Sequence, residues 1–242
     1  TPVNAARSDG SLAPLHQLVA YEDRPRRWEA WDLDFDYPDK AEPIEAPADS
    51  IELVEDHPLR STFEVRRRWR ASEIVLRYTL EAGADRVEIA HEIDWREERT
   101  LLRALYPTAI RARHARFGVP FGFLDRPTHR NSSREQAAFE LPGQRWMELA
   151  QPGLALRVED DGSKHGRSVD GGTLGLSLLR APNFPDPDAD RGRHEFTLWC
   201  QALSPPFSSP PPSAHCPPPT AGPAHHGRRH PLPVTDATPT HP

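Results

Sequence analysis

Proline is the residue that most limits how this chain can fold. The 242 residues include 28 prolines, and 13 of these lie between positions 205 and 242. A proline inside a helix removes a backbone hydrogen bond and clashes with the preceding turn, so long helices are excluded. Residues 205–242 also lack a periodic apolar pattern, and they could not bury enough surface to offset the entropy of ordering. We therefore expect a folded domain over residues 1–204 and a disordered Pro/His-rich tail over residues 205–242.

Apolar residues recur at every second position in several segments of the first 204 residues. In residues 73–80, Ile74, Leu76 and Tyr78 fall on one face of an extended chain. Such segments are 62–69, 73–80, 86–95, 154–158, 174–178 and 194–199. The one helical pattern covers residues 133–141 and ends at Pro142. Short alternating segments at intervals of about ten residues predict an all-β domain, an antiparallel β-sandwich.

The charge balance and the apolar pattern exclude two classes of protein. The chain has 30 Lys and Arg against 36 Asp and Glu, a formal charge of -6. A protein that binds the phosphate backbone of nucleic acid usually carries a basic face, so no nucleic-acid partner is expected. No stretch approaches the roughly 20 apolar residues that a membrane span needs, so no membrane partner is expected.

The usual signatures of a catalytic or metal site are missing from the sequence. It contains no Gly-rich phosphate loop and no Gly-x-Ser-x-Gly turn. The histidines before residue 205 show no close metal-ligand spacing, and His91 is expected to be a hydrogen-bonded core residue. A glycosidase needs two carboxylates at a fixed separation, and the sequence alone does not pair any two of Asp32, Asp34, Asp36 and Asp94 across a cleft.

Tryptophans beside charged residues suggest a different kind of site. Trp28 and Trp31 flank Glu29, and Trp146 follows Arg145. Flat apolar rings next to carboxylate and guanidinium groups suit sugars, which present apolar faces and a rim of hydroxyl groups. The alternative is that these tryptophans fill the core of the sandwich, and both interpretations stay open at this point.

One ordered series of motifs resembles a known family. The segment Tyr21-Glu22-Asp23-Arg24-Pro25, followed by Trp28-Glu29-Ala30-Trp31-Asp32, resembles the "DxPxxWDAWD" segment of glycoside hydrolase family 38 α-mannosidases. The closest branch is the cytosolic and vacuolar type with its bacterial relatives, and the resemblance covers roughly residues 8–198. Further matches, in the family's order, are Asp94-Trp95, Tyr106-Pro107, Pro120-Phe121-Gly122, Arg126-Pro127-Thr128-His129-Arg130-Asn131, Gln144-Arg145-Trp146, Lys164-His165-Gly166, Leu176–Pro182 and His194-Glu195-Phe196-Thr197.

The resemblance implies a specific fold, activity and location. It implies a sandwich of the galactose-mutarotase-like supersandwich type, incomplete at both ends, in a cytoplasmic enzyme that hydrolyses terminal α-D-mannosides of oligosaccharides. In this family an α/β barrel carries the nucleophile and a zinc or cobalt ion, and a helical domain follows it. This chain matches only the β part, so the resemblance assigns it no catalytic residue, metal ligand or cofactor. It is expected to be inactive alone and to have its own catalytic barrel and helical domain as partners.

The resemblance also suggests which residues wall the substrate cleft or form the domain interface. Their alternative role, as anchors between the sheets, remains open. The candidates are Trp28, Trp31, Asp32, Arg126, His129, Asn131, Arg145 and Trp146.

The sequence leaves two other functions open, and its C-terminal part departs from the family pattern. The chain could instead be a standalone carbohydrate-binding module, or an interaction protein whose Pro-rich tail docks partners. After Thr197 the family continues as "YALxPH", whereas this chain continues from Leu198 into the Pro-rich tail. A frameshift and a genuine tail both explain that change, and the loss of closing strands would leave exposed sheet edges.

Overall fold

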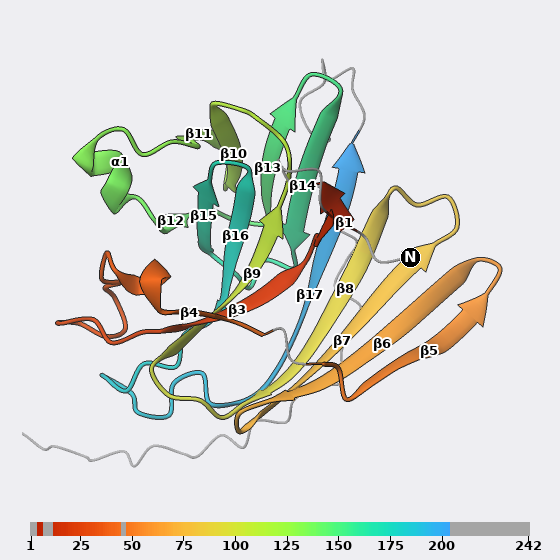
Figure 1. The fold of residues 1–242 in the computed structure, drawn as a ribbon, viewed down its shortest axis with the longest axis horizontal. Helices are drawn as coiled ribbons and strands as arrows, with labels where there is room; N and C mark the ends of the chain where they lie inside the picture. Colours follow the sequence, from red (N-terminus) through yellow and green to blue (C-terminus); the bar gives the residue numbers. More distant parts are fainter. Residues whose placement is uncertain (1–3, 7–11, 45–46, 204–242) are drawn as a thin grey trace, which may run out of the picture. The chain divides into compact units, whose positions relative to one another are not determined.

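A computed structural model describes residues 4–6, 12–44 and 47–203 (Figure 1). All of them belong to one compact unit, Thr1–Pro206. The predicted tail over residues 205–242, with its partner-docking role, lies outside the described residues. The boundary at residue 204 therefore stays a prediction.

The larger layer of the fold is a nine-stranded antiparallel sheet. Its two outermost strands are β11 and β5, and the long strand β17 lies between β14 and β8 near the middle. In spatial order the strands are β11 (Gly122–Pro127), β10 (His114–Val119), β13 (Trp146–Gln151), β14 (Leu154–Asp160), β17 (Gly192–Leu203), β8 (Arg86–Trp95), β7 (Ser72–Glu81), β6 (Arg60–Trp69) and β5 (Ser50–His57).

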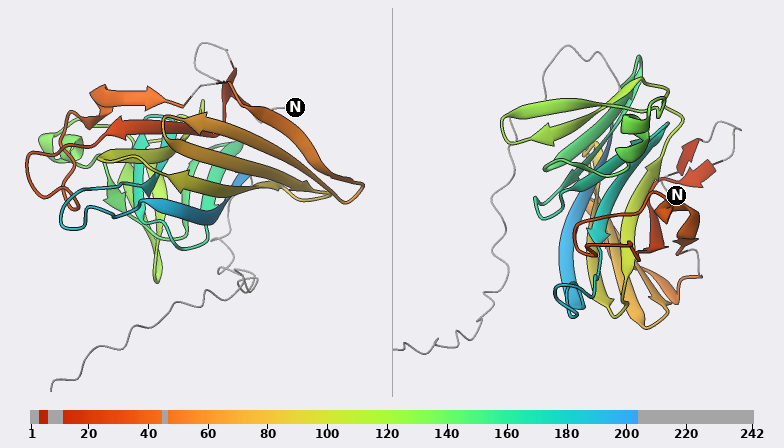
Figure 2. Two further views of the ribbon diagram at one scale, coloured as in Figure 1. Left: turned by 90° about the horizontal axis from the view of Figure 1, so that it is seen from below. Right: turned by 90° about the vertical axis from the view of Figure 1, so that its left-hand side faces the viewer.

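The smaller layer is a six-stranded antiparallel sheet that packs on the first (Figure 2). Its strands are, in order, β12 (Leu141–Pro142), β15 (Gly166–Asp170), β16 (Thr173–Leu179), β9 (Thr100–Pro107), β3 (Gln17–Glu22) and β4 (Ala41–Pro43). A separate pair is formed by β1 (Asn4–Ala6) and β2 (Leu12–Pro14). The helical elements are the 3-10 turn η1 (Tyr37–Lys40) and the short helix α1 (Ser133–Ala137).

The inner faces of the two sheets form one apolar core. Ile74, Ile93 and Trp95 come from the nine-stranded sheet, and Leu102 and Leu174 come from the six-stranded sheet. All five side chains have at most 1% of their surface exposed, despite lying far apart in the sequence. The predicted antiparallel β-sandwich is therefore confirmed.

Two sequence expectations need correction. The helix predicted over 133–141 is shorter and consists of α1 alone. It begins as predicted, behind a capping box of Ser132 and Glu135, but Ala138 leaves the helical backbone conformation and the chain is extended again at Leu141. Segment 62–69 does form β6, but Phe63 on its inner face is 45% exposed and Glu64 on its outer face is buried. The six-stranded sheet does not reach this end of β6, so alternation predicted the strand correctly and the burial wrongly.

The strand β17 also continues beyond the last motif of the resemblance. Residues up to Gln201 pair with β8, and residues up to Leu203 pair with β14. The side chains of Leu198 and Cys200 are buried in the core. The residues just after Thr197 therefore complete the nine-stranded sheet.

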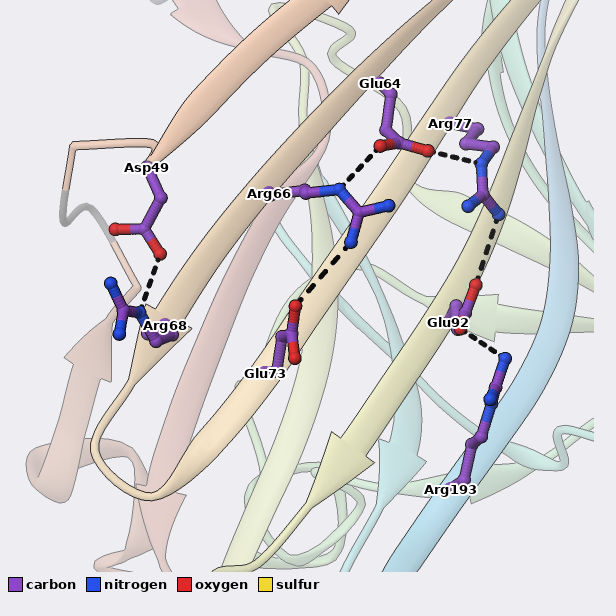
Figure 3. A network of polar contacts seen from close by, with 8 residues as sticks. All are labelled: Asp49, Glu64, Arg66, Arg68, Glu73, Arg77, Glu92 and Arg193. Carbon is purple, nitrogen blue, oxygen red and sulfur yellow. Dashed lines mark hydrogen bonds and ion pairs between the residues drawn. The ribbon is translucent and has the colours of Figure 1, made fainter.

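Linked arginine and acidic side chains lie on the outer face of the nine-stranded sheet over β6, β7, β8 and β17 (Figure 3). Glu64 accepts hydrogen bonds from Nε of Arg66 at 2.6 Å and from Nε of Arg77 at 2.7 Å. Arg77 continues to Glu92, with 3.3 Å between Nη1 and Oε2. Burial alone would raise the pKa of Glu64, but these two arginines outweigh it and lower that pKa. The outer face is thus held by linked charges rather than by a third layer.

A chain of hydrogen bonds crosses the core at His91. Its Nδ1 lies 2.9 Å from the carbonyl oxygen of Ile89, and its Nε2 lies 3.3 Å from Nε2 of His16. The Nδ1 of His16 lies 3.0 Å from the hydroxyl of Tyr78. If His91 donates to Ile89, then His16 donates to His91 and Tyr78 donates to His16, so every bond is made with both imidazoles neutral. The predicted core role of His91 is confirmed.

Burial lowers the pKa of both imidazoles. The pKa of His16 falls to about 4, through burial and then the charge of Arg67, although part of the residue's surface is exposed. The rings of His91, Tyr78 and Tyr106 enclose it, with centroids 5.2–6.0 Å away. The pKa of His91 falls well below 6.5, through burial and then His16.

Mild acid should therefore destabilise the domain. A group whose pKa is lowered by folding contributes stability above its unfolded pKa of about 6.5, and that contribution is lost as the pH falls toward the folded value. For His16 alone the free energy of unfolding should fall by about 2 kcal/mol between pH 7.5 and pH 5. Urea denaturation followed by tryptophan fluorescence measures it. His16→Gln should reduce the change in the free energy of unfolding with pH. His114→Gln is the control, since His114 is exposed on β10, and it should leave that change as it is. An equal pH dependence of stability in both variants would contradict the assignment to His16.

Candidate functional site

The structure separates the eight candidate residues into three groups. Only the first group places aromatic rings on an exposed loop, and it is not in contact with the third. The groups are Trp28, Trp31 and Asp32 in the loop between β3 and η1; Arg126, His129 and Asn131 from the end of β11 to the turn before α1; and Arg145 and Trp146 at the start of β13.

Three exposed aromatic residues form what we call the aromatic surface: Trp28, Trp31 and Phe184. Their side chains are 60%, 64% and 54% exposed. The ring centroids of Trp28 and Trp31 are 6.4 Å apart, and those of Trp31 and Phe184 are 6.5 Å apart. Exposed aromatic side chains gathered in this way mark a binding surface more often than scattered ones do. Sequence reasoning missed Phe184, since nothing in its local pattern links it to a residue some 150 positions earlier.

Arg180 fixes the loop that carries the aromatic surface. Its Nε donates to Oδ2 of Asp23 at 2.6 Å, and its Nη2 reaches Oδ1 at 3.3 Å. It also donates to the carbonyl oxygens of Ala30 and Asp32. Asp23 is 3% exposed, and burial raises its pKa against the opposing effect of Arg180. Arg180 directly follows β16 and thus holds residues 23, 30 and 32 of the loop between β3 and η1, which we call the tryptophan loop (residues 23–36).

Glu29, between the two tryptophans, ties the same loop to its neighbours. Its Oε2 accepts a hydrogen bond from the backbone N–H of Asn183 at 2.9 Å, and its Oε1 lies 2.8 Å from Nη2 of Arg99. The backbone bond from Asn183, followed by the interactions with Arg99, lowers the pKa of Glu29 despite opposing desolvation. Asp32 differs, because among the described residues its carboxylate has no partner, so it is available to a ligand.

A cavity of about 400 Å³ lies beyond η1, between the loop and α1. Phe35 lines it from the loop, and Arg130 and Gln136 line it from the α1 side. The second candidate group is absent from the cavity lining: Arg126 lies on β11 opposite Ala115, and Asn131 and His129 contact α1. The backbone N–H of Asn131 donates to Oε2 of Glu135 at 2.8 Å, and Nδ1 of His129 lies 3.5 Å from the same oxygen.

The third group lies on the outer face of the nine-stranded sheet. The indole of Trp146 crosses Gly118, where a Cβ atom would come within 2.6 Å of its Nε1. The guanidinium of Arg157 lies 5.3 Å from the Trp146 ring, and Phe123 packs against it with ring centroids 6.3 Å apart. Trp146 therefore packs on the sheet and does not join Trp28 and Trp31.

This arrangement has groups that can contact a ligand. Two acids of the loop that carries Trp28 and Trp31, Asp23 and Glu29, are each engaged by an arginine. Within the described ranges, no group of three or more His, Cys, Asp or Glu residues could hold a metal ion. The same ranges contain no helix long and apolar enough to cross a membrane. What the site presents to a ligand is aromatic surface and a free carboxylate.

Comparison with known proteins identifies the family. The model of the glycosyl hydrolases family 38 C-terminal domain matches residues 6–188. This chain belongs to that family. The family 38 domain is 36% identical to human Alpha-mannosidase 2C1 over 186 residues, and 32% identical to Alpha-mannosidase G of Dictyostelium discoideum over 196 residues. These matches cover 75% and 79% of the chain but only 18% of either relative.

A solved structure supports the same fold. The family 38 domain superposes on an alpha-mannosidase from Enterococcus faecalis V583 with a TM-score of 0.69 and 15% sequence identity. The match covers 84% of this chain and 28% of that protein. The predicted family and the predicted β-sandwich are thus confirmed, and the chain corresponds to a minor part of each of these relatives.

Removing Arg180 should release the aromatic surface. Arg180→Ala leaves the Asp23 carboxylate buried without its cation, which should lower the free energy of unfolding by about 3–5 kcal/mol. Iodide quenching of tryptophan fluorescence should increase as the loop loosens. Arg24→Ala is the matched control, since it breaks an exposed ion pair with Glu22 in the same loop and should change stability much less.

A double substitution separates stability from loop position. Arg180→Met combined with Asp23→Leu removes both charges and should recover most of the stability. Iodide quenching should stay high, because the bonds to Ala30 and Asp32 are still lost. Normal quenching in the double variant would show that Arg180 does not position the loop.

Proposed function

We propose that this family 38 domain works as the C-terminal β-domain of an α-mannosidase that hydrolyses terminal α-D-mannosides of oligosaccharides. Its family and its α-mannosidase relatives support this role. Hydrolysis requires a nucleophile and an acid/base carboxylate in register, and the family resemblance assigns these to a separate catalytic barrel. Zinc or cobalt is likewise a prediction for that barrel, and the cytoplasmic location also stays a prediction.

The observation that carries the proposal is the aromatic surface held rigidly by Arg180. A rigid aromatic surface can stack on the apolar face of a sugar without first paying to order its loop. We infer that Trp28 and Trp31 wall the mannoside cleft or meet the catalytic barrel, with Asp32 available to accept a hydrogen bond from a sugar hydroxyl. Arg126, His129 and Asn131 would help to position the segment that contains α1. Arg145 and Trp146 would stabilise the nine-stranded sheet and would not contact the sugar.

A chimaera tests this role in a complete enzyme. The chain replaces the matching segment of human Alpha-mannosidase 2C1, and hydrolysis of an aryl α-mannoside is followed. Loss of one stacked aromatic ring corresponds to about 1 kcal/mol, so Trp31→Ala should raise KM about fivefold. Phe63→Ala, which truncates an exposed aromatic on β6, should leave KM unchanged. An active chimaera with unchanged KM after both Trp28→Ala and Trp31→Ala would contradict the proposal.

A second candidate function is sugar binding by the isolated chain. The exposure of Trp28 and Trp31 favours it, because both rings are accessible without any partner domain. Titration with methyl α-mannoside should then give a saturable change in tryptophan fluorescence. The change should be lost in the Trp28→Ala/Trp31→Ala variant and kept in Phe63→Ala. The absence of saturation would remove this function and leave the first one standing.

A further inference from the structure

The nine-stranded sheet has an edge at β5 that exposes backbone groups as well as side chains. Figure 1 shows β5 as its outermost strand, and among the described strands β5 pairs with β6 alone. A strand in this position offers unpaired backbone N–H and C=O groups to any other extended chain. The residues of β5, Ser-Ile-Glu-Leu-Val-Glu-Asp-His, include three acids and no Lys or Arg.

Two large apolar side chains of β5 lie on the inner face, without cover from the described residues. Ile51 is 68% exposed and Leu53 is 48% exposed. Their register partners on β6 are Val65 and Phe63, so they continue the apolar face of the core. The six-stranded sheet ends at β4, which approaches only the far end of β6, where Trp69 donates to Glu42 at 3.1 Å.

The outer face of β5 has an unbalanced charge. Glu52 stands directly opposite Glu64, and like charges in this position repel each other. The two oxygens of Glu64 are already bonded to Arg66 and Arg77, as Figure 3 shows. Among the described residues, Glu52 itself has no hydrogen-bond or ion-pair partner. Because β5 is the edge strand, a cation on an added strand would lie beside Glu52 and relieve the repulsion.

We propose that β5 accepts an added strand from a partner polypeptide whose residues alternate between basic and apolar. A basic side chain on that strand lies opposite Glu52, and its apolar neighbours pack beside Ile51 and Leu53 on the other face. Backbone hydrogen bonds give the affinity and the alternation gives the specificity. A β-bulge between Leu53 and Glu55 shifts the register of β5, so the proposed strand pairs with the segment before the bulge, Ser50–Leu53.

The charges argue against a second copy of this chain as the occupant. Two β5 edges paired along Ser50–Leu53 would bring Glu52 of one chain close to Glu52 of the other. Such like-charge pairs across strands are destabilising. A partner with basic residues replaces that repulsion with attraction, which is why the proposal specifies the basic pattern.

Labelled peptides test the proposal on the full chain. One peptide alternates arginine and valine, a second alternates glutamate and valine, and a third has arginine and valine in two separate blocks. We expect fluorescence anisotropy to show binding of the first peptide only, and hydrogen exchange to show protection of the Ser50–Leu53 amides. Glu52→Lys should weaken binding of the first peptide about fivefold and create binding of the second. Asp39→Lys makes the same charge change on the exposed turn η1 and should alter neither.

Three results would overturn the proposal. Equal binding of the block peptide would show attraction by net charge alone. Equal weakening by Glu52→Lys and Asp39→Lys would place the contact elsewhere than β5. A concentration-dependent dimer in sedimentation that Leu53→Asp abolishes would make a second copy of the chain the occupant of this edge.

Discussion

The difference in width between the two sheets shapes the rest of the structure. Nine strands face six, so the smaller sheet covers the middle of the larger one and leaves its β5 end open. Where the sheets overlap, Ile74, Ile93 and Trp95 are fully enclosed. Where they do not, Ile51 and Leu53 on the same face remain exposed. Whether an apolar side chain is buried therefore depends on where its strand lies in the order across the sheet, as much as on the alternation within the strand.

Two buried ion pairs hold segments that apolar packing alone would not orient. Asp160 at the end of β14 bonds to Arg167 on β15, with both side chains 1% exposed, and so ties one sheet to the other. Asp23 and Arg180 do the same for the tryptophan loop. A buried pair adds little net stability compared with apolar residues, but a half-removed pair is strongly unfavourable. We infer that these pairs mainly select one arrangement of the loops and sheets.

The alternation of apolar and polar residues was enough to predict strands with one buried face and one solvent-exposed face. The strands β7 and β8 are of this kind, with Ile74 and Ile93 inward and charged residues outward. The strand β9 was not predicted because it is buried on both faces: Leu102 faces the core, while Leu101 packs under Tyr37 and its neighbours. Covering by a distant loop leaves no periodic signal in the strand that it covers.

The candidate site was only partly predictable for a similar reason. Trp28 and Trp31 stood out because they are close in the sequence, and the structure does place them together. Trp146 had the same local character, yet it packs flat on the outer face over Gly118. Phe184 and Arg180 complete the surface through contacts that span most of the chain. Local patterns identified residue types suited to sugars, whereas their grouping depends on the tertiary fold.

The position of β17 has a consequence for how the domain forms during synthesis. Within the nine-stranded sheet, β5, β6, β7 and β8 form one half and β10, β11, β13 and β14 form the other. Among the described strands, β17 alone joins them. A ribosome makes β17 after every other described strand. The edges of β8 and β14 that pair with β17 therefore stay unpaired until residues 192–203 emerge. Such late, long-range closure is slow and exposes aggregation-prone edges. A nascent chain of this domain should therefore depend more on chaperones than its finished core suggests.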